Sequence, residues 1–184
     1  MKIYCFKASA SRFNSFLFNK DYWDIQDSIG VGHSLIGKWT PIPVRNLFKE
    51  DEGEFPKTAG DFPSLSGSIP VVSEKAWQIL SAYIKNEVEA LPLITKTGSY
   101  FALNVLDIVD GLDKEKSEIS YRSSGRVSRV FKYVFHEEKI KGKYMFKIPE
   151  TKGLEVYVSE EFKKLIEENN LKGLDFSKIV FTAE

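Results

Sequence analysis

The stretch from Ser73 to Asp113 constrains the fold most, because the spacing of its apolar residues changes from that of a helix to that of strands. Between residues 73 and 89, apolar residues recur every three or four positions. Ser73 can cap the first turn, and Glu74 lies beside its unpaired N–H groups. The pattern predicts an amphipathic helix over about 73–89, with Pro92 just beyond its end.

A predicted hairpin follows this helix. Two apolar segments, 91–94 and 100–105, flank the polar loop 95–99, which contains Gly98. A helix of this length and an isolated hairpin are both marginally stable in water. We therefore expect the helix and the hairpin to pack their apolar faces against each other.

The remaining pattern also mixes strands and helices. A second predicted hairpin joins 117–123 to 127–136, with Phe131, Tyr133 and Phe135 on one face and Lys132 and His136 on the other. Residues 107–113 are expected to form a short helical turn, and a second amphipathic helix over about 159–170 begins at Ser159. The order of elements predicts an α+β fold with a largely antiparallel sheet.

The N-terminal third is expected to be irregular. Residues 1–68 are assigned edge strands and long loops, because Pro41 and Pro43 interrupt 35–48 and residues 49–68 are rich in charge, proline and glycine. A chain of 184 residues is long enough for one good core. We predict one domain over 1–184, with residues 69–184 as its α+β core.

Net charge and cysteine content limit the class of protein. The chain has 26 basic and 26 acidic residues, which argues against a generic binder of polyanions. Cys5 is the only cysteine, so an internal disulfide is excluded and a reducing compartment is expected. The first residues lack the apolar stretch of a signal peptide, and no segment is long enough to span a membrane. These features predict a cytoplasmic protein.

Charge is concentrated in one stretch. Residues 120–149 hold eight basic and two acidic side chains, whereas 61–119 and 150–184 are net acidic. Such a stretch can meet nucleic acid or an acidic protein, or can protect sheet edges from pairing with other chains. We rank a protein partner above nucleic acid because the rest of the surface is acidic. The candidate contact residues in it are Arg122, Arg126, Arg129 and Lys132.

Candidate catalytic and metal sites are weak. The segment 32–37 resembles the nucleophile elbow of hydrolases around Ser34, but Ile36 stands where a small residue is needed. The spacing of Asp107, Asp110 and Asp113 fails the pattern of a calcium loop and is more typical of a solvated acidic face with one aspartate capping a turn. Neither histidine has the spacing of a metal ligand set. No catalytic residue, cofactor or metal site is predicted.

Several short segments occur together in a recognisable order: Leu91-Pro92-Leu93, Tyr100, Asn104-Val105, Asp113, Ser117, Phe146-Lys147, 156–162 and 171–176. Over roughly residues 70–180, they resemble the immunity-protein domains of bacterial polymorphic toxin systems, long classed as a domain of unknown function. The resemblance implies a protein that binds and neutralises a cognate toxin domain without catalysis. It carries over no functional residues, because the matching positions are structural.

An inhibitor of this kind needs exposed aromatic or arginine anchors. The aromatic candidates in or beside polar loops are Tyr22, Trp23, Trp39, Phe55 and Phe62, and burial beneath those loops is the other interpretation. Two other functions stay open: a small hydrolase-like enzyme using Ser34 or the three aspartates, and a nucleic-acid-binding accessory protein using residues 120–149.

Overall fold

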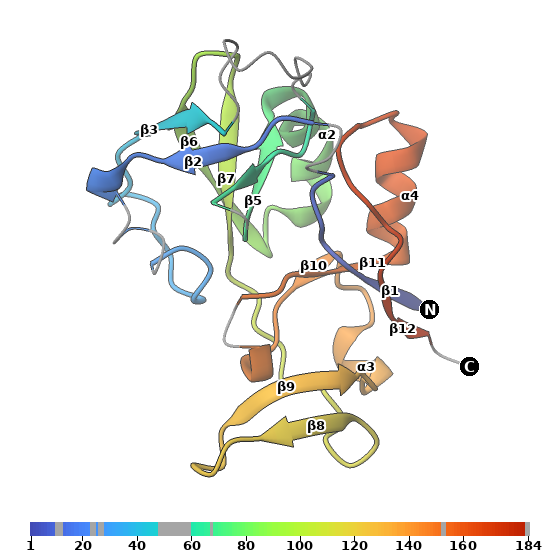
Figure 1. Cartoon of the computed structure of the whole chain (residues 1–184). Helices are drawn as coiled ribbons and strands as arrows, with labels where there is room; N and C mark the ends of the chain where they lie inside the picture. The colour runs from blue at the N-terminus through green and yellow to red at the C-terminus, as the bar shows by residue number, and fades with distance from the viewer. Residues whose placement is uncertain are drawn as a thin grey trace.

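The structure is a computed structural model, which describes residues 1–9, 13–22, 25, 28–47, 60–66, 68–151 and 154–182. The elements form a six-stranded barrel, a four-stranded sheet and a two-stranded hairpin (Figure 1), which confirms the predicted α+β fold. In chain order they are β1 (Lys2–Cys5), β2 (Phe16–Phe18), η1 (Lys20–Tyr22), β3 (Ile42–Asn46), β4 (Ser64–Leu65), β5 (Ile69–Ser73), α2 (Glu74–Ile84), β6 (Val88–Ile94), β7 (Tyr100–Val105), β8 (Glu118–Tyr121), β9 (Val127–Lys132), α3 (Glu137–Ile140), β10 (Met145–Phe146), η3 (Pro149–Thr151), β11 (Tyr157–Ser159), α4 (Glu160–Glu168) and β12 (Ile179–Thr182).

The first predicted helix and hairpin are present, with one shifted boundary. The Ser73 hydroxyl accepts a hydrogen bond from the N–H of Ala76 at 3.1 Å and so caps α2. The helix ends at Ile84 and not near residue 89. Val88 fits the apolar stripe of the helix, but it instead begins β6, where it pairs with Val105 of β7. Pro92 accordingly lies inside β6 and does not follow a helix.

The barrel has the strand order β2-β3-β6-β7-β5-β4. Its pairs are antiparallel except for β2 with β4 and β3 with β6. The expectation of an edge or broken strand within 35–48 is therefore wrong, because β3 pairs on both sides. Most of the long loop predicted over 49–68 lies outside the described residues.

The four-stranded sheet is antiparallel, in the order β10-β11-β1-β12, so the first strand of the chain lies between two of the last. The helices α2 and α4 bury their apolar faces in one core shared by this sheet and the barrel (Figure 1). That core includes Tyr4, Leu80, Leu103, Val158 and Phe162. Because it draws on both sheets, the barrel and the four-stranded sheet support each other.

The hairpin of β8 and β9 lies at the end of the molecule opposite the barrel (Figure 1). Its buried Val130 packs in a third core with Phe135, Phe146 and Tyr157. The segment 107–113, which leads into the hairpin, is extended and not a helical turn as predicted. Its backbone pairs at long range instead, in isolated bridges from Ile108 to Lys147 and from Leu112 to Phe135. No helix in the described part of the chain is long and apolar enough to cross a membrane.

Candidate functional site

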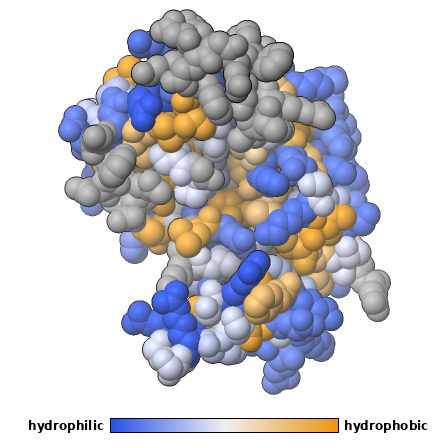
Figure 2. Space-filling model, in the orientation of Figure 1, coloured by the Kyte–Doolittle hydropathy of each residue, from blue (hydrophilic) through white to orange (hydrophobic). Residues whose placement is uncertain are grey.

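The β8–β9 hairpin presents the four basic side chains that the sequence singled out. Arg122 and Arg126 close its turn through a backbone hydrogen bond of 2.8 Å, and Arg129 and Lys132 lie on β9. All four are exposed, and within the described ranges none forms an ion pair. Figure 2 shows hydrophilic residues around this end of the molecule, with a smaller hydrophobic area between them. The fold thus gathers the predicted charge on one projecting element.

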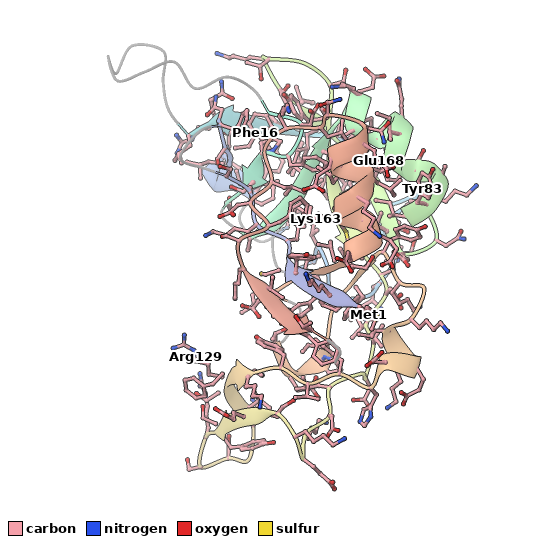
Figure 3. All side chains as sticks on the ribbon, turned by 90° about the vertical axis from the view of Figure 1, so that its right-hand side faces the viewer. Met1, Phe16, Tyr83, Arg129, Lys163 and Glu168 are labelled. Carbon is pink, nitrogen blue, oxygen red and sulfur yellow. The ribbon has the colours of Figure 1, made fainter. Side chains whose placement is uncertain are left out.

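Phe131 is exposed on this hairpin, whereas Phe135, which was predicted to share its face, is buried. Ile119 of β8 pairs with Val130 of β9, and Glu118 of β8 pairs with Lys132 of β9. Phe131 therefore has no partner residue on β8. A bulge of this kind adds one residue and re-aims the side chains beside it. Phe131 is 61% exposed, and the Arg129 guanidinium carbon lies 5.2 Å from its ring centroid. Figure 3 shows Arg129 projecting from the body of the molecule.

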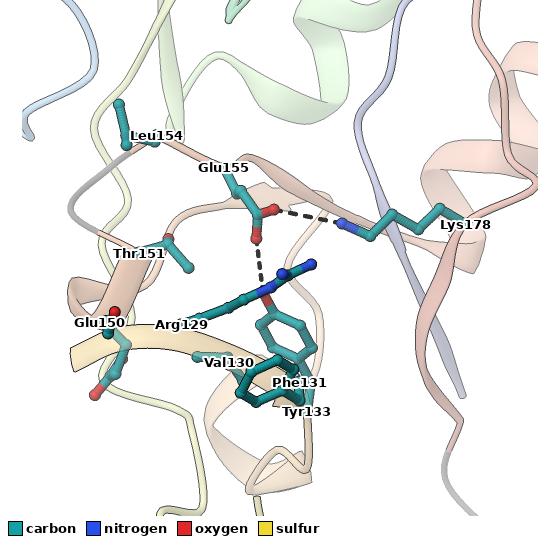
Figure 4. Close-up of a pocket in the computed structure, with 10 residues that line it drawn as sticks. Arg129, Val130, Phe131, Tyr133, Glu150, Thr151, Leu154, Glu155 and Lys178 are labelled. Atoms are coloured by element: carbon teal, nitrogen blue, oxygen red, sulfur yellow. Dashed lines mark hydrogen bonds and ion pairs between the residues drawn. The ribbon is translucent and has the colours of Figure 1, made fainter. Parts of the chain in front are cut away.

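A cleft of about 340 Å³ opens between β9 and residues 150, 151, 154 and 155, and we call it the hairpin cleft (Figure 4). Arg129 and Phe131 line one side, and Leu154, which is 68% exposed, lines the other. The volume is near the lower end of the range for small-molecule pockets, roughly 300–1,000 Å³, and the cleft is open to solvent. Its size suits an anchor side chain of a protein partner.

The Glu155 carboxylate lines the hairpin cleft. It accepts a hydrogen bond from the Tyr133 hydroxyl at 2.7 Å and lies 3.4 Å from the Lys178 ammonium (Figure 4). It also accepts a hydrogen bond from the Tyr157 hydroxyl at 2.6 Å. Burial raises the pKa of Glu155, but the hydrogen bonds from the two tyrosines and the charge of Lys178 outweigh burial and hold it below its usual range. Burial raises the pKa of both tyrosines. Glu155 is therefore ionised and the tyrosines are neutral donors.

This arrangement predicts a contribution of Glu155 to stability that depends on pH. A carboxyl group with a lowered pKa in the folded state stabilises the protein above its ordinary value of 4.5 and loses this effect as the pH falls below it. We expect the Glu155→Gln variant to be less stable than wild type at pH 7 and to lose less stability between pH 5 and pH 3. Urea unfolding at several pH values measures the stability at pH 7 and the loss of stability between pH 5 and pH 3. Glu168→Gln, at an exposed position on α4, should keep the wild-type pH slope.

Ser34, the candidate nucleophile, belongs to a structural network. Its hydroxyl donates to the Glu89 carboxylate, which also accepts from the N–H of Leu35 at 2.8 Å and from the Asn104 amide at 2.9 Å. Burial raises the pKa of Glu89, but these hydrogen bonds outweigh burial and lower it overall. A carboxylate of low pKa is a poor general base at neutral pH. The network instead fixes the loop around residues 28–37 to β6 and β7.

The three aspartates do not converge on one side of a turn. Asp107 pairs with Lys143 at 2.7 Å, while Asp110 is exposed. Asp113 is buried and accepts hydrogen bonds from the backbone N–H groups of residues 115 and 116, each at 3.1 Å, so it caps a turn as expected. Among the described residues, no group of three or more His, Cys, Asp or Glu side chains is placed to hold a metal ion.

The aromatic candidates are dispersed. Tyr22 and Trp39 are half-buried against the barrel core, and the Trp39 indole N–H donates to the carbonyl of Pro92 at 2.9 Å. Phe62 is fully buried in the core shared by α2 and α4, so the expectation of an exposed anchor is wrong for this residue. Trp23 and Phe55 lie outside the described residues.

Sequence reasoning missed three residues of this surface. Phe131 was predicted only to share a strand face with Tyr133 and Phe135, and neither Leu154 nor Tyr121 was named as a contact residue. All three residues of this surface, Phe131, Leu154 and Tyr121, are more than half exposed. The available signal was the alternation of aromatic and basic residues within 121–133. That signal does not indicate which strand face is exposed.

A comparison with protein-family models matches this chain. The model of an immunity protein family, Imm11, matches residues 7–180, which is nearly the whole chain. The search of curated proteins found no match. The family match extends beyond the 70–180 resemblance and includes β2, β3 and β4, the strands of the N-terminal third that close the barrel. The chain belongs to the Imm11 immunity protein family.

Proposed function

We propose that this protein binds a cognate toxin domain, made by the same cell or its kin, and neutralises it by forming a stoichiometric complex. The family match over residues 7–180 carries this proposal. The geometry supports it, because exposed arginines beside exposed aromatic rings are typical of the anchors of protein interfaces. We place the encounter in the cytoplasm, where a single thiol such as Cys5 stays reduced.

Binding without catalysis is favoured by the roles of the polar residues. The hydroxyl of Ser34 is held by Glu89, and Asp107 and Asp113 each have a different partner. A general role in binding nucleic acid is disfavoured by a net charge of zero and by the acidic segments on both sides of residues 120–149 in the sequence.

The test is coexpression with the C-terminal domain of the toxin encoded beside the gene for this chain. We expect coexpression to restore growth, and the two purified proteins to form a 1:1 complex in size-exclusion chromatography with light scattering. Ser34→Ala should retain full protection, because the hydroxyl acts only on the stability of the loop. Protection without a complex at micromolar concentrations, or protection lost in a folded Ser34→Ala variant, would favour an enzyme.

A further inference from the structure

We infer that the hairpin cleft receives an acidic, extended segment of the toxin, with an apolar side chain between Phe131 and Leu154 and carboxylates on Arg126 and Arg129. This inference rests on the proposed function and adds to it the surface and the chemistry of the partner. Three observations support it independently: the apolar rim of the cleft, the charge in and around the cleft, and the attachment of the hairpin to the body of the molecule.

The rim of the cleft is apolar on both sides. Phe131 on β9 and Leu154 on the opposite segment are 61% and 68% exposed, and both line the same cleft. Single exposed apolar side chains need no explanation, but two that face one cleft form a site for a buried anchor. Covering such side chains contributes about 25 cal/mol for each Å² of apolar surface removed from water.

Charge in and around the cleft selects an anionic partner. The two carboxylates that line it have cationic partners within the protein. Glu150 Oε1 lies 2.9 Å from the Lys114 ammonium, while Glu150 Oε2 has no hydrogen-bond partner among the described residues. Glu155 is held by two tyrosines and Lys178. The cations of the hairpin are not: in the described part of the chain, Arg122, Arg126, Arg129 and Lys132 have no carboxylate partner. Arginine binds carboxylates in a bidentate geometry, so an acidic segment would supply the carboxylate partners that these side chains lack.

The base of the hairpin is held to the body of the molecule, so the β9 side of the cleft is in place before binding. The Ser117 hydroxyl accepts from the N–H of Val134 at 3.0 Å, which ties the two ends of the hairpin together. Phe135, just beyond it, packs edge-on against Phe146 and Phe181. A preformed cleft loses little conformational entropy on binding, which favours affinity.

A protein segment fits this surface better than nucleic acid. The aromatic ring of Phe131 is already covered on one face by Arg129, whereas single-stranded nucleic acid requires open rings in series for stacking. Leu154 offers an aliphatic contact, which suits an apolar side chain of a peptide.

The experiment measures the affinity of the purified full-length protein for the toxin domain by calorimetry. We expect Arg126→Glu/Arg129→Glu to raise the Kd at least about 100-fold and Phe131→Ala about 10-fold. A matched control, Lys96→Glu/Lys164→Glu, makes the same change of charge at exposed positions that do not line the cleft and should keep the Kd within about threefold. Circular dichroism and urea unfolding check that each variant is folded.

A second measurement does not depend on substitutions. Hydrogen–deuterium exchange of the wild-type complex should show slower exchange in residues 118–132 and 154–158 than in the free protein. Wild-type affinity in the hairpin variants, with no change of exchange in these segments, would overturn this inference and leave the proposed function standing. Absence of any complex with the wild-type protein would instead overturn the proposed function. Hairpin variants that lose affinity for a 20-nucleotide single-stranded RNA while keeping the toxin would assign the surface to nucleic acid and overturn the inference.

Discussion

Replacing Asn104 with leucine should lower the free energy of unfolding by roughly 3–5 kcal/mol, although the two side chains are similar in size. Asn104 is fully buried on β7 and makes three hydrogen bonds across the barrel wall. Its amide oxygen accepts from the N–H of Gly30 at 2.6 Å, and its amide nitrogen donates to the His33 carbonyl and to the Glu89 carboxylate, each at 2.9 Å. Leucine cannot form these hydrogen bonds. The Gly30 N–H, the His33 carbonyl and the buried, charged Glu89 carboxylate would each lose a partner.

Urea unfolding monitored by circular dichroism measures this effect. Asn86→Leu is the matched control, because Asn86 is exposed in the turn after α2 and should change stability by less than about 1 kcal/mol. Hydrogen exchange should also accelerate at the amides of Gly30 and Leu35, since the loop loses its attachment to β7. A loss of stability no larger than that of the control would mean that the network does not hold the loop.

Local features of the fold were predictable from the sequence, and long-range pairing was not. Ser73 and Ser159 cap their helices because a cap depends on the next three residues alone. Closure of the barrel depends on the parallel pairing of Ile42 with Leu93, about fifty residues apart, for which the sequence has no local signal. The early end of α2 has a similar cause, because Val88 fits either a helical stripe or a strand until its partner Val105 is known.

The candidate site was predictable in its charge and not in its shape. Arg122, Arg126 and Arg129 were identified because basic residues are scarce in the flanking segments. The hairpin cleft depends on a bulge that turns Phe131 outward and on the approach of Leu154 from another segment. A single extra residue in a strand reverses which side chains face the core, and regular alternation cannot reveal it.

Phe62, which is buried, and Phe131, which is exposed, provide the second large effect. Phe62→Ala should lower the free energy of unfolding by about 3–5 kcal/mol, because the ring is fully buried among α2, α4 and β1 and its removal leaves a cavity. Phe131→Ala should cost about 1 kcal/mol or less, since the exposed ring loses mainly its contact with Arg129. Urea unfolding of the two variants, side by side with wild type, compares the same chemical change at both sites.

The same pair separates structural from functional roles when toxin binding is measured on the folded fraction of each variant. Phe62→Ala should keep the wild-type Kd for the toxin domain, because its side chain contributes to a core away from the hairpin cleft. Phe131→Ala should lose affinity while it keeps its stability. Phe62→Ala should have the larger effect on stability, and Phe131→Ala should have the larger effect on the Kd. Both results together are expected only if the Phe62 ring stabilises the fold and the Phe131 ring contacts the partner. A Phe131→Ala variant that unfolds as easily as Phe62→Ala would show that the hairpin ring is part of the core, and the cleft would then have no exposed aromatic anchor.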